Sequence, residues 1–298
     1  MPNESTIGIS IILPVHNEEK LVEQSLNFLS AYFTERKWDF ELILAEDNST
    51  DETVPIIKRM SLENDRIKLV SIKSRIGKGG AILAATVNFS LKNYVAYMDI
   101  DLSAHPSELE KLLGSIDNYD VVIGSRILDS SSVSINRPFY RTLLSHLYSK
   151  LFRFLFRIPI RDPQCGLKLF KKDKIRPVFT AITTPDFAFD TDLVVTAFSR
   201  NLTIKEVPIN WRHVEDSKVR VGREINAMMM DLISIWYNSH LLWLNGQDTY
   251  PQKKGSIFGK LLFAILSNNN RMKKRIQENK NRMLLARSKT KEVIFSNI

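Results

Sequence analysis

Short apolar segments alternate with longer amphipathic ones over the first 130 residues of this 298-residue chain. The apolar segments are rich in Val, Ile and Leu, and their length predicts strands at 7–14, 40–45, 67–72, 94–99 and 121–124. Between them, the pattern predicts helices at 18–33, 51–62, 78–91 and 106–116. Such alternation predicts an α/β, Rossmann-like fold with a mostly parallel sheet flanked by helices. Its ligands are expected at the carboxyl ends of the strands.

Polar motifs fall at those strand ends, in chain order: 14–19, 46–51, 75–81 and 99–101. Each motif alone has a structural explanation, because Asn17 or Asn48 can cap a helix and Gly77 can form a turn. Together they predict a polar rim along one edge of the sheet. The glycines around Lys78 match neither a dinucleotide fingerprint nor a P-loop, so a dehydrogenase or an NTPase is poorly supported.

Asp99 and Asp101 are the strongest chemical signal in the chain. They stand one residue apart at the end of the apolar run 94–98, so both carboxylates point the same way if the strand continues through them. Two like charges this close are stabilised by a cation between them, and carboxylate oxygens suit Mg²⁺ or Mn²⁺ that bridges to substrate phosphates. The alternative is that the pair caps the following helix. The two residues by themselves do not decide between these interpretations.

The net charge of +9 is confined to the C-terminal end of the chain. Residues 252–298 contain twelve basic and two acidic side chains, which leaves a net charge of −1 for residues 1–251. Specific nucleic-acid binding by the main domain is therefore not expected. We expect a catalytic domain at 1–245 and a basic tail at 246–298. The tail also carries an apolar stretch at 257–266, so it is expected to lie on an anionic membrane surface or to be partly disordered.

Two further segments have helical periodicity and an amphipathic character. In 141–157, the apolar residues Leu144, Leu147, Leu151, Phe154 and Leu155 share one side and basic residues line another. This pattern fits a helix at a membrane interface and, equally, a helix packed on the core. The segment 225–244 is apolar enough to pack or to lie in an interface, but too polar to be assigned as a membrane span. No signal peptide is expected at the start of the chain, and the single Cys165 fits a reducing compartment.

Several longer motifs resemble one enzyme family. They are Val122–Arg126, Tyr140–Leu144, Arg161–Phe170, Phe189–Asp190, Val207–Trp211 and Ser217–Lys218. The chain resembles family 2 glycosyltransferases of the GT-A fold. Within that family it is similar to the dolichyl-phosphate β-glucosyltransferases and the dolichyl-phosphate mannose synthases. The resemblance runs to about Leu244, and the string R-D-P-Q-C-G-L-K-L-F at 161–170 is specific for the glucosyl branch.

The resemblance implies roles for particular residues of this chain. It implies a nucleotide-sugar pocket with Asp47 near the base and Glu18 near the ribose, formed by Pro14, Asn17, Glu18, Asp47, Lys78 and Asp99. Asp99 and Asp101 would hold the cation. In some mannose synthases a glutamine two residues after the D-x-D adds a metal contact, but Ser103 stands at that position, which leaves a third protein ligand in doubt. The lipid-phosphate acceptor would be bound by Arg126, Arg141, Ser145 and Lys218.

The implied reaction is inverting, metal-dependent transfer of a hexose to a polyprenyl phosphate, with dolichyl-phosphate glucose made from UDP-glucose as the leading hypothesis. The phosphate oxygen of such an acceptor is already anionic near pH 7, so it needs no general base. Asp190 and Asp192 are therefore expected to have positioning or helix N-terminal roles. The alternatives are a mannosyl- or N-acetylhexosaminyltransferase and a catalytically inactive membrane-docking module of the same fold. The implied location is the cytoplasmic face of a membrane.

Overall fold

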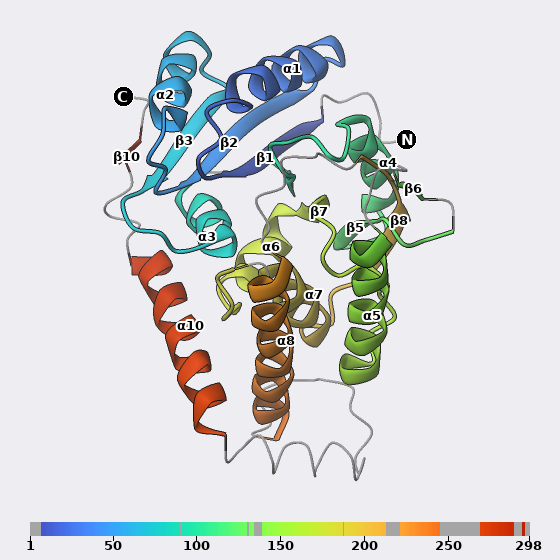
Figure 1. Cartoon of the computed structure of the whole chain (residues 1–298). Helices are drawn as coiled ribbons and strands as arrows, with labels where there is room; N and C mark the ends of the chain where they lie inside the picture. The colour runs from blue at the N-terminus through green and yellow to red at the C-terminus, as the bar shows by residue number, and fades with distance from the viewer. Residues whose placement is uncertain are drawn as a thin grey trace.

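The computed structural model describes residues 7–89, 91–129, 131–133, 139–186, 188–212, 221–244, 269–288 and 294–295. Its centre is an eight-stranded sheet in the order β10-β3-β2-β1-β4-β7-β5-β8 (Figure 1). The strands of this sheet are β1 (Gly8–Val15), β2 (Asp39–Asp47), β3 (Ile67–Ile72), β4 (Tyr94–Tyr97), β5 (Val121–Ser125), β7 (Lys168–Lys171), β8 (Ile204–Pro208) and β10 (Ile294–Phe295). A small separate ladder pairs β6 (Ser132–Val133) with β9 (Asn210–Trp211).

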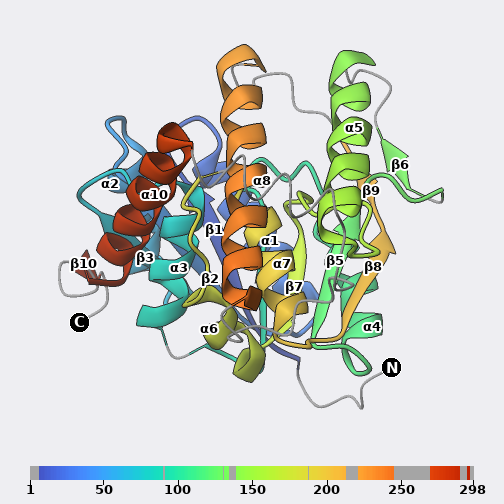
Figure 2. The ribbon, with the colours of Figure 1, turned by 90° about the horizontal axis from the view of Figure 1, so that it is seen from below.

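The first four helices follow the alternation predicted for the first 130 residues, with bounds that differ by up to four residues, and further helices come after them in the described residues. The helices are α1 (Val22–Glu35), α2 (Thr53–Glu63), α3 (Lys78–Asn88), α4 (Ser107–Ile116), α5 (Phe139–Phe156), α6 (Lys172–Phe179), α7 (Phe189–Ser199), α8 (Val221–Leu244) and α10 (Asn270–Ser288). In Figure 1, α1 and α2 cover one face of the sheet, and α3, α6 and α7 lie on the other. The long helices α5, α8 and α10 extend beyond that second layer, and α8 lies between the other two (Figure 2).

The mostly parallel sheet predicted from the sequence is confirmed. Strands β3, β2, β1 and β4 are parallel, and β1 and β2 are buried along most of their length. Burial on both faces explains why these segments read as nearly continuous apolar runs. Two strands run the other way: β7 is antiparallel to both β4 and β5, and β10 is antiparallel to β3. The sequence pattern did not predict β7, because Lys168 and Lys171 interrupt its short apolar run.

The described part of the predicted tail packs against the rest of the protein. Helix α10 contacts α3 and α8, and its Met272, Ile276 and Met283 side chains are buried. After it, β10 adds a short strand to the edge of β3. The segments 270–288 and 294–295 therefore belong to the same body as the sheet, instead of extending away from it. The apolar stretch 257–266 lies outside the described residues, and the division at residue 245 stays a prediction.

Helices α5 and α8 also pack on this body. In α5, Phe152, Leu155 and Phe156 are buried, and in α8 Asp231, Leu232 and Trp236 are buried. Within the described residues, no helix is both long enough and apolar enough to cross a membrane.

Candidate functional site

Asp99 and Asp101 lie just beyond the carboxyl end of β4, a strand in the middle of the sheet. The predicted strand 94–99 ends at Tyr97, so both carboxylates stand in the segment that follows it, and strand alternation does not place them on one face. The Asp99 side chain is 41% exposed, and its Oδ1 accepts a hydrogen bond of 2.8 Å from Lys78 Nζ at the start of α3. Burial opposes the charge on Lys78, but Asp99 and Asp190 more than offset it and raise the pKa of the ammonium above its usual value. The D-x-D motif is therefore next to a lysine that stays charged over the physiological pH range.

Ser103 holds the second carboxylate of the motif. Asp101 Oδ1 accepts hydrogen bonds from the Ser103 backbone N–H at 2.9 Å and from its hydroxyl at 2.8 Å. Burial and the neighbouring Asp99 charge raise the pKa of Asp101, although the Ser103 bonds act in the opposite direction. The serine that departs from the mannose-synthase pattern thus orients one of the two expected metal ligands. The sequence drew attention to Ser103 but did not predict its hydrogen bonds to Asp101.

Gly166 leaves room for Asp99 on its other side. A Cβ atom added at Gly166 would lie 2.1 Å from Asp99 Oδ2, closer than any real contact allows. The glycine of the 161–170 string is therefore needed for the observed position of the carboxylate. A close approach of this kind is visible only once the fold brings the two segments together.

A buried cluster of charged side chains lies next to the D-x-D motif. Asp190, in the first turn of α7, accepts hydrogen bonds from Lys168 Nζ of β7 and from the Tyr97 hydroxyl of β4. Its Oδ2 also lies 3.8 Å from Lys78 Nζ. Burial disfavours the charged carboxylate, but Lys168 and Lys78 offset this effect and hold the pKa of Asp190 below its usual value. The expected positioning role of Asp190 at a helix N-terminus is consistent with this geometry.

Sequence reasoning missed Lys168 and Tyr97. Lys168 is fully buried, and a buried lysine is almost always paired. Its place inside the apolar run Leu167–Phe170 was the available signal. Tyr97 and Lys168 are also direct partners in the β4–β7 ladder, which the sequence does not reveal.

The second polar motif holds the loop before α3. Asp47, buried at the end of β2, accepts hydrogen bonds from the backbone N–H of Ile76 at 2.7 Å and of Gly77 at 2.9 Å. Gly77 has a φ of +89°, a conformation that favours glycine, and Lys78 follows it directly. Asp47 and Lys78, both predicted to contact the nucleotide sugar, are therefore brought together by one loop.

The first polar motif is joined to the second by a set of side-chain bonds. Asn17 has a φ of +56°, its N–H donates to Ser49 Oγ at 3.0 Å, and its Oδ1 accepts from Thr50 N–H at 2.8 Å. The Glu18 N–H donates to Thr53 Oγ1 at 2.8 Å. Pro14 lies beside Ala45 in the β1–β2 ladder. The rim predicted along the carboxyl edge of the sheet is present, and these residues form its β1 and β2 part.

A model of glycosyl transferase family 2 matches residues 10–179, which is more than half of the chain. The chain belongs to this family. The match covers the four polar motifs of the rim and the strands that precede them, apart from the first two residues of β1.

Proteins with more than one name are similar to this glycosyltransferase. It is 29% identical over 237 residues to glycosyltransferase AglD of Haloferax volcanii, a match that covers 78% of this chain but only 37% of AglD. It is 27% identical over 256 residues to the dolichyl-phosphate β-glucosyltransferase of Saccharomyces cerevisiae, with 78% and 75% of the two chains covered. The human protein of that name is 28% identical over 229 residues, with 72% and 70% covered.

Solved structures agree on the fold. Glucosyl-3-phosphoglycerate synthase from Mycobacterium tuberculosis, solved with Mn²⁺, UDP and phosphoglyceric acid, matches with a TM-score of 0.57 and 20% identity, covering 78% of each chain. At this identity the likeness concerns the fold alone. The GT-A architecture expected for a family 2 glycosyltransferase is confirmed.

The residues expected to bind the acceptor come from different segments of the glycosyltransferase. The Arg126 guanidinium is mostly buried and donates two hydrogen bonds to Asp162, at 2.8 and 2.9 Å. Burial opposes the charge on Arg126, but Asp162, with smaller contributions from Cys165 and Asp99, raises its pKa. Arg141 lies near the start of α5, Ser145 follows it one turn later and is partly buried, and Lys218 lies outside the described residues.

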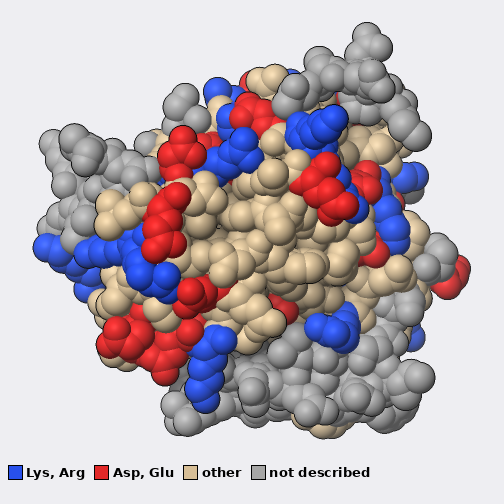
Figure 3. All heavy atoms as spheres, turned by 90° about the horizontal axis from the view of Figure 1, so that it is seen from above, with Lys and Arg blue, Asp and Glu red and all other residues tan. Residues whose placement is uncertain are grey.

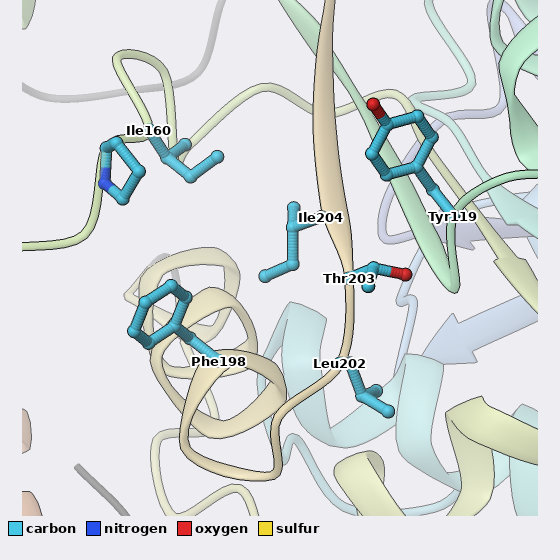
Figure 4. Close-up of a pocket in the computed structure, with 7 residues that line it drawn as sticks. Tyr119, Ile160, Phe198, Leu202, Thr203 and Ile204 are labelled. Atoms are coloured by element: carbon cyan, nitrogen blue, oxygen red, sulfur yellow. The ribbon is translucent and has the colours of Figure 1, made fainter. Parts of the chain in front are cut away.

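A cavity of about 270 Å³ lies elsewhere, and Figure 4 shows its lining. It is lined mainly by apolar side chains, among them Tyr119, Phe198, Leu202 and Ile204. These residues stand near the amino ends of β5 and β8, at the opposite edge of the sheet from Asp99. The cavity is therefore separate from the D-x-D site.

Proposed function

We propose that this glycosyltransferase transfers glucose from UDP-glucose to a polyprenyl phosphate such as dolichyl phosphate, with inversion at the anomeric carbon. The β-glucosyltransferase names of its relatives support the donor and the acceptor. The Mn²⁺ and UDP in the mycobacterial structure support a cation-dependent nucleotide-sugar site in this fold.

The D-x-D residues fit a divalent cation. Asp99 and Asp101 present two carboxylates whose mutual repulsion contributes to the raised pKa of Asp101, and the Lys78 ammonium already pairs with Asp99. Among the described residues, no group of three or more His, Cys, Asp or Glu side chains could hold a metal by itself. Two protein carboxylates plus donor phosphates suit Mg²⁺ or Mn²⁺. Bound there, the cation would neutralise the charge that develops on a departing diphosphate.

The state of Asp190 carries the proposal for a phosphate acceptor. A hydroxyl acceptor needs a base to take its proton. Asp190 is the carboxylate that α7 brings beside Lys78, but it is buried, bound to Lys168 and Tyr97, and has a lowered pKa. These features make it a weak base. A phosphate oxygen is already anionic near pH 7 and reacts without such a base.

The acceptor phosphate needs cationic donors. We propose Arg126, Arg141, Ser145 and Lys218 for this role, as the family resemblance implies. In this proposal Asp162 fixes the plane of the Arg126 guanidinium, and the N–H groups that do not bond to Asp162 would donate to the phosphate. Asp99 contributes to the raised pKa of Arg126, which supports a location on the same side of the site as the D-x-D motif.

We further propose that the protein associates with the cytoplasmic face of a membrane through α5. Its inward side chains pack on the core, but Tyr140, Leu143, Leu147 and Phe154 are 46–61% exposed at helical spacing. We call these four residues the outer stripe of α5. Three exposed basic residues lie on or directly after the same helix: Lys150, Arg153 and Arg157. Exposed apolar and basic side chains together suit an anionic lipid surface. Figure 3 shows the opposite side of the molecule, where the visible charges of both signs are mixed.

A transfer assay tests the proposal. The purified protein is incubated with Mn²⁺ or Mg²⁺ and, in parallel, with UDP-glucose, GDP-mannose or UDP-N-acetylglucosamine. Each donor is combined with a polyprenyl phosphate or with the matching polyprenol, and lipid-linked sugar is measured by mass spectrometry. We expect glucose transfer to the phosphate and none to the alcohol.

Each other result supports an alternative. Transfer from GDP-mannose or UDP-N-acetylglucosamine alone would support the mannosyl or N-acetylhexosaminyl alternative. Transfer to the alcohol would contradict the argument from Asp190. Absence of both transfer and donor hydrolysis would support a non-catalytic docking module.

A further inference from the structure

Helix α10 lies against the helix that begins at the donor site. It contacts α3, and the two helices lie side by side in Figures 1 and 2. Met272, Ile276 and Met283 bury their side chains, while the rest of the helix is largely polar. A polar helix held by so few apolar contacts depends on its other interactions for a fixed position.

Arg282 of α10 lies beside the loop 76–78, which leads into α3. It donates two hydrogen bonds to Asp186, from Nη1 to Oδ2 at 2.5 Å and from Nη2 to Oδ1 at 2.9 Å. Both partners are next to Gly77: a Cβ added there would lie 2.4 Å from Asp186 Oδ1 and 3.1 Å from Arg282 Nη2. The ion pair therefore covers the backbone of Gly77.

Segment 183–186 connects this ion pair to the N-terminus of α3. The Pro185 carbonyl accepts hydrogen bonds from the N–H groups of Gly79 at 2.7 Å and Gly80 at 3.2 Å. The preceding Thr183 and Thr184 are fixed by the buried Asp192, which accepts from their backbone N–H groups at 2.8 and 3.0 Å. Asp186 is thus attached to α3 on one side and to α10 on the other.

The covered loop carries residues of the donor site. The N–H groups of Ile76 and Gly77 donate to Asp47, and Lys78 Nζ donates to Asp99. The raised pKa of Arg282 is caused mainly by Asp186, with a smaller contribution from Asp47. The tail arginine is therefore within electrostatic reach of the carboxylate expected near the nucleotide base.

We propose that Arg282 is a positioning residue for the nucleotide-sugar site: acting through Asp186, it holds the loop 76–78 in the conformation that binds the donor. The proposal rests on the proposed function for the identity of the donor. It gives the C-terminal segment a role in donor binding that is distinct from attachment to a membrane.

Arg275 provides a matched control on the same helix. It donates two hydrogen bonds to Asp231 of α8, at 2.6 and 2.9 Å, and so makes an ion pair of the same type. Asp231 belongs to α8 and is buried, whereas Asp186 is 41% exposed. Removing Arg275 should therefore affect stability more than removing Arg282, because a buried charge loses a partner.

Two measurements on the full chain test the proposal. Affinity for UDP with Mn²⁺ is measured by calorimetry, and amide hydrogen exchange of peptides covering 76–80 is followed without any ligand. For Arg282→Ala we expect a Kd for UDP about 5-fold or more above wild type, the low end of ordinary coupling between sites. We also expect faster exchange at 76–80, a higher KM for UDP-glucose, and an unchanged KM for the lipid phosphate.

Two further variants distinguish positioning of the loop 76–78 from a general contribution to protein stability. Arg282→Lys keeps the positive charge but loses the two parallel N–H donors of the guanidinium, so it should retain part of the affinity for UDP. Arg275→Ala should lower the unfolding temperature and leave the Kd for UDP and the exchange of 76–80 unchanged.

Other outcomes would overturn the proposal. Unchanged exchange and unchanged UDP affinity in Arg282→Ala would show that the ion pair does not position the loop. If Arg282→Ala and Arg275→Ala lose UDP affinity equally, and the loss follows the fall in unfolding temperature, the role of Arg282 is purely structural. If wild-type protein binds no UDP, the proposed function fails, while the exchange comparison still decides whether Arg282 holds the loop.

Discussion

The polar rim and the outer stripe of α5 differ in how their side chains are paired. On the rim, Asp47 and Asp101 accept hydrogen bonds from within the protein, and so does the buried Asp190 next to it. The outer stripe instead exposes Leu147 and Phe154, which are 58% and 61% exposed. A preorganised polar site binds a soluble ligand without rearrangement, whereas an exposed apolar stripe requires a partner to cover it. The difference separates the part proposed to bind the nucleotide sugar from the part proposed to contact the lipid.

The largest effect should come from the rim. Asp99→Asn removes a charge that the proposed cation and diphosphate site needs. We therefore expect transfer to fall by at least about a hundredfold, in line with a loss of several kcal/mol of transition-state stabilisation. Steady-state transfer at saturating Mn²⁺ measures it. Asp173→Asn, at an exposed carboxylate of α6, serves as the control and should be neutral. Wild-type rates in Asp99→Asn would remove the basis for the metal site.

A smaller loss is expected when Asp99 is displaced but kept. Gly166→Ala places a Cβ 2.1 Å from Asp99 Oδ2, so the carboxylate must move. A displacement of about 1 Å can cost roughly 10²-fold in rate, and we expect a loss between tenfold and that value. The matched control is Gly114→Ala in α4, where a Cβ meets nothing within 4 Å and helix stability should rise by about 0.5–1 kcal/mol. Equal activity of the two variants would show that Asp99 tolerates the shift.

The outer stripe of α5 should govern vesicle binding and not donor chemistry. The double variant Leu147→Glu, Phe154→Glu removes two apolar side chains, each worth about 1.5–3 kcal/mol when fully buried. We expect at least a tenfold drop in co-sedimentation with anionic vesicles and no change in UDP affinity. Leu62→Glu, at a leucine that is 84% exposed, is the control, because its helix α2 lies far from α5 in Figure 1. If both variants bind vesicles equally, the protein attaches elsewhere.

The smallest effect is expected at Cys165, beside the Arg126–Asp162 pair. Burial, and secondarily the charge of Asp162, raises the pKa of this thiol to about 12. The thiolate fraction therefore stays very small at pH 8 and grows only as the pH approaches that value. We expect no alkylation by iodoacetamide at pH 8 in the native protein, and full alkylation in denaturant, by intact mass. Rapid native alkylation would show that the segment around Cys165 opens readily.

The local elements of the fold could be predicted, whereas contacts between distant segments could not. The strands before Val15 and Asp47 were predicted because they are apolar runs, and the polar rim was predicted because it follows them. By contrast, β7 lies between β4 and β5 through long-range pairing that leaves no periodic signal.

The same limit applied to the site and to the tail. Arg126 was predicted as a phosphate ligand from the resemblance, but its binding to Asp162 joins residues 36 positions apart. The predicted tail was interpreted from its charge, because Met272, Ile276 and Met283 are too few to mark a packed helix. Arg141 and Ser145 stay predictions, and Lys218 lies outside the described residues.

The contact between Arg282 and the Gly77 loop also has a consequence for the newly made chain. The two residues are 205 positions apart, so at about 5–20 residues per second the ribosome needs roughly 10–40 s to supply the arginine after the loop. Strand β10, which covers the edge of β3, is synthesised later still. During this interval the β3 edge is open to pairing with other chains. We therefore expect the segment that carries β3 and the Gly77 loop to be most open to misassembly, and most accessible to chaperones, before the C-terminal residues are made.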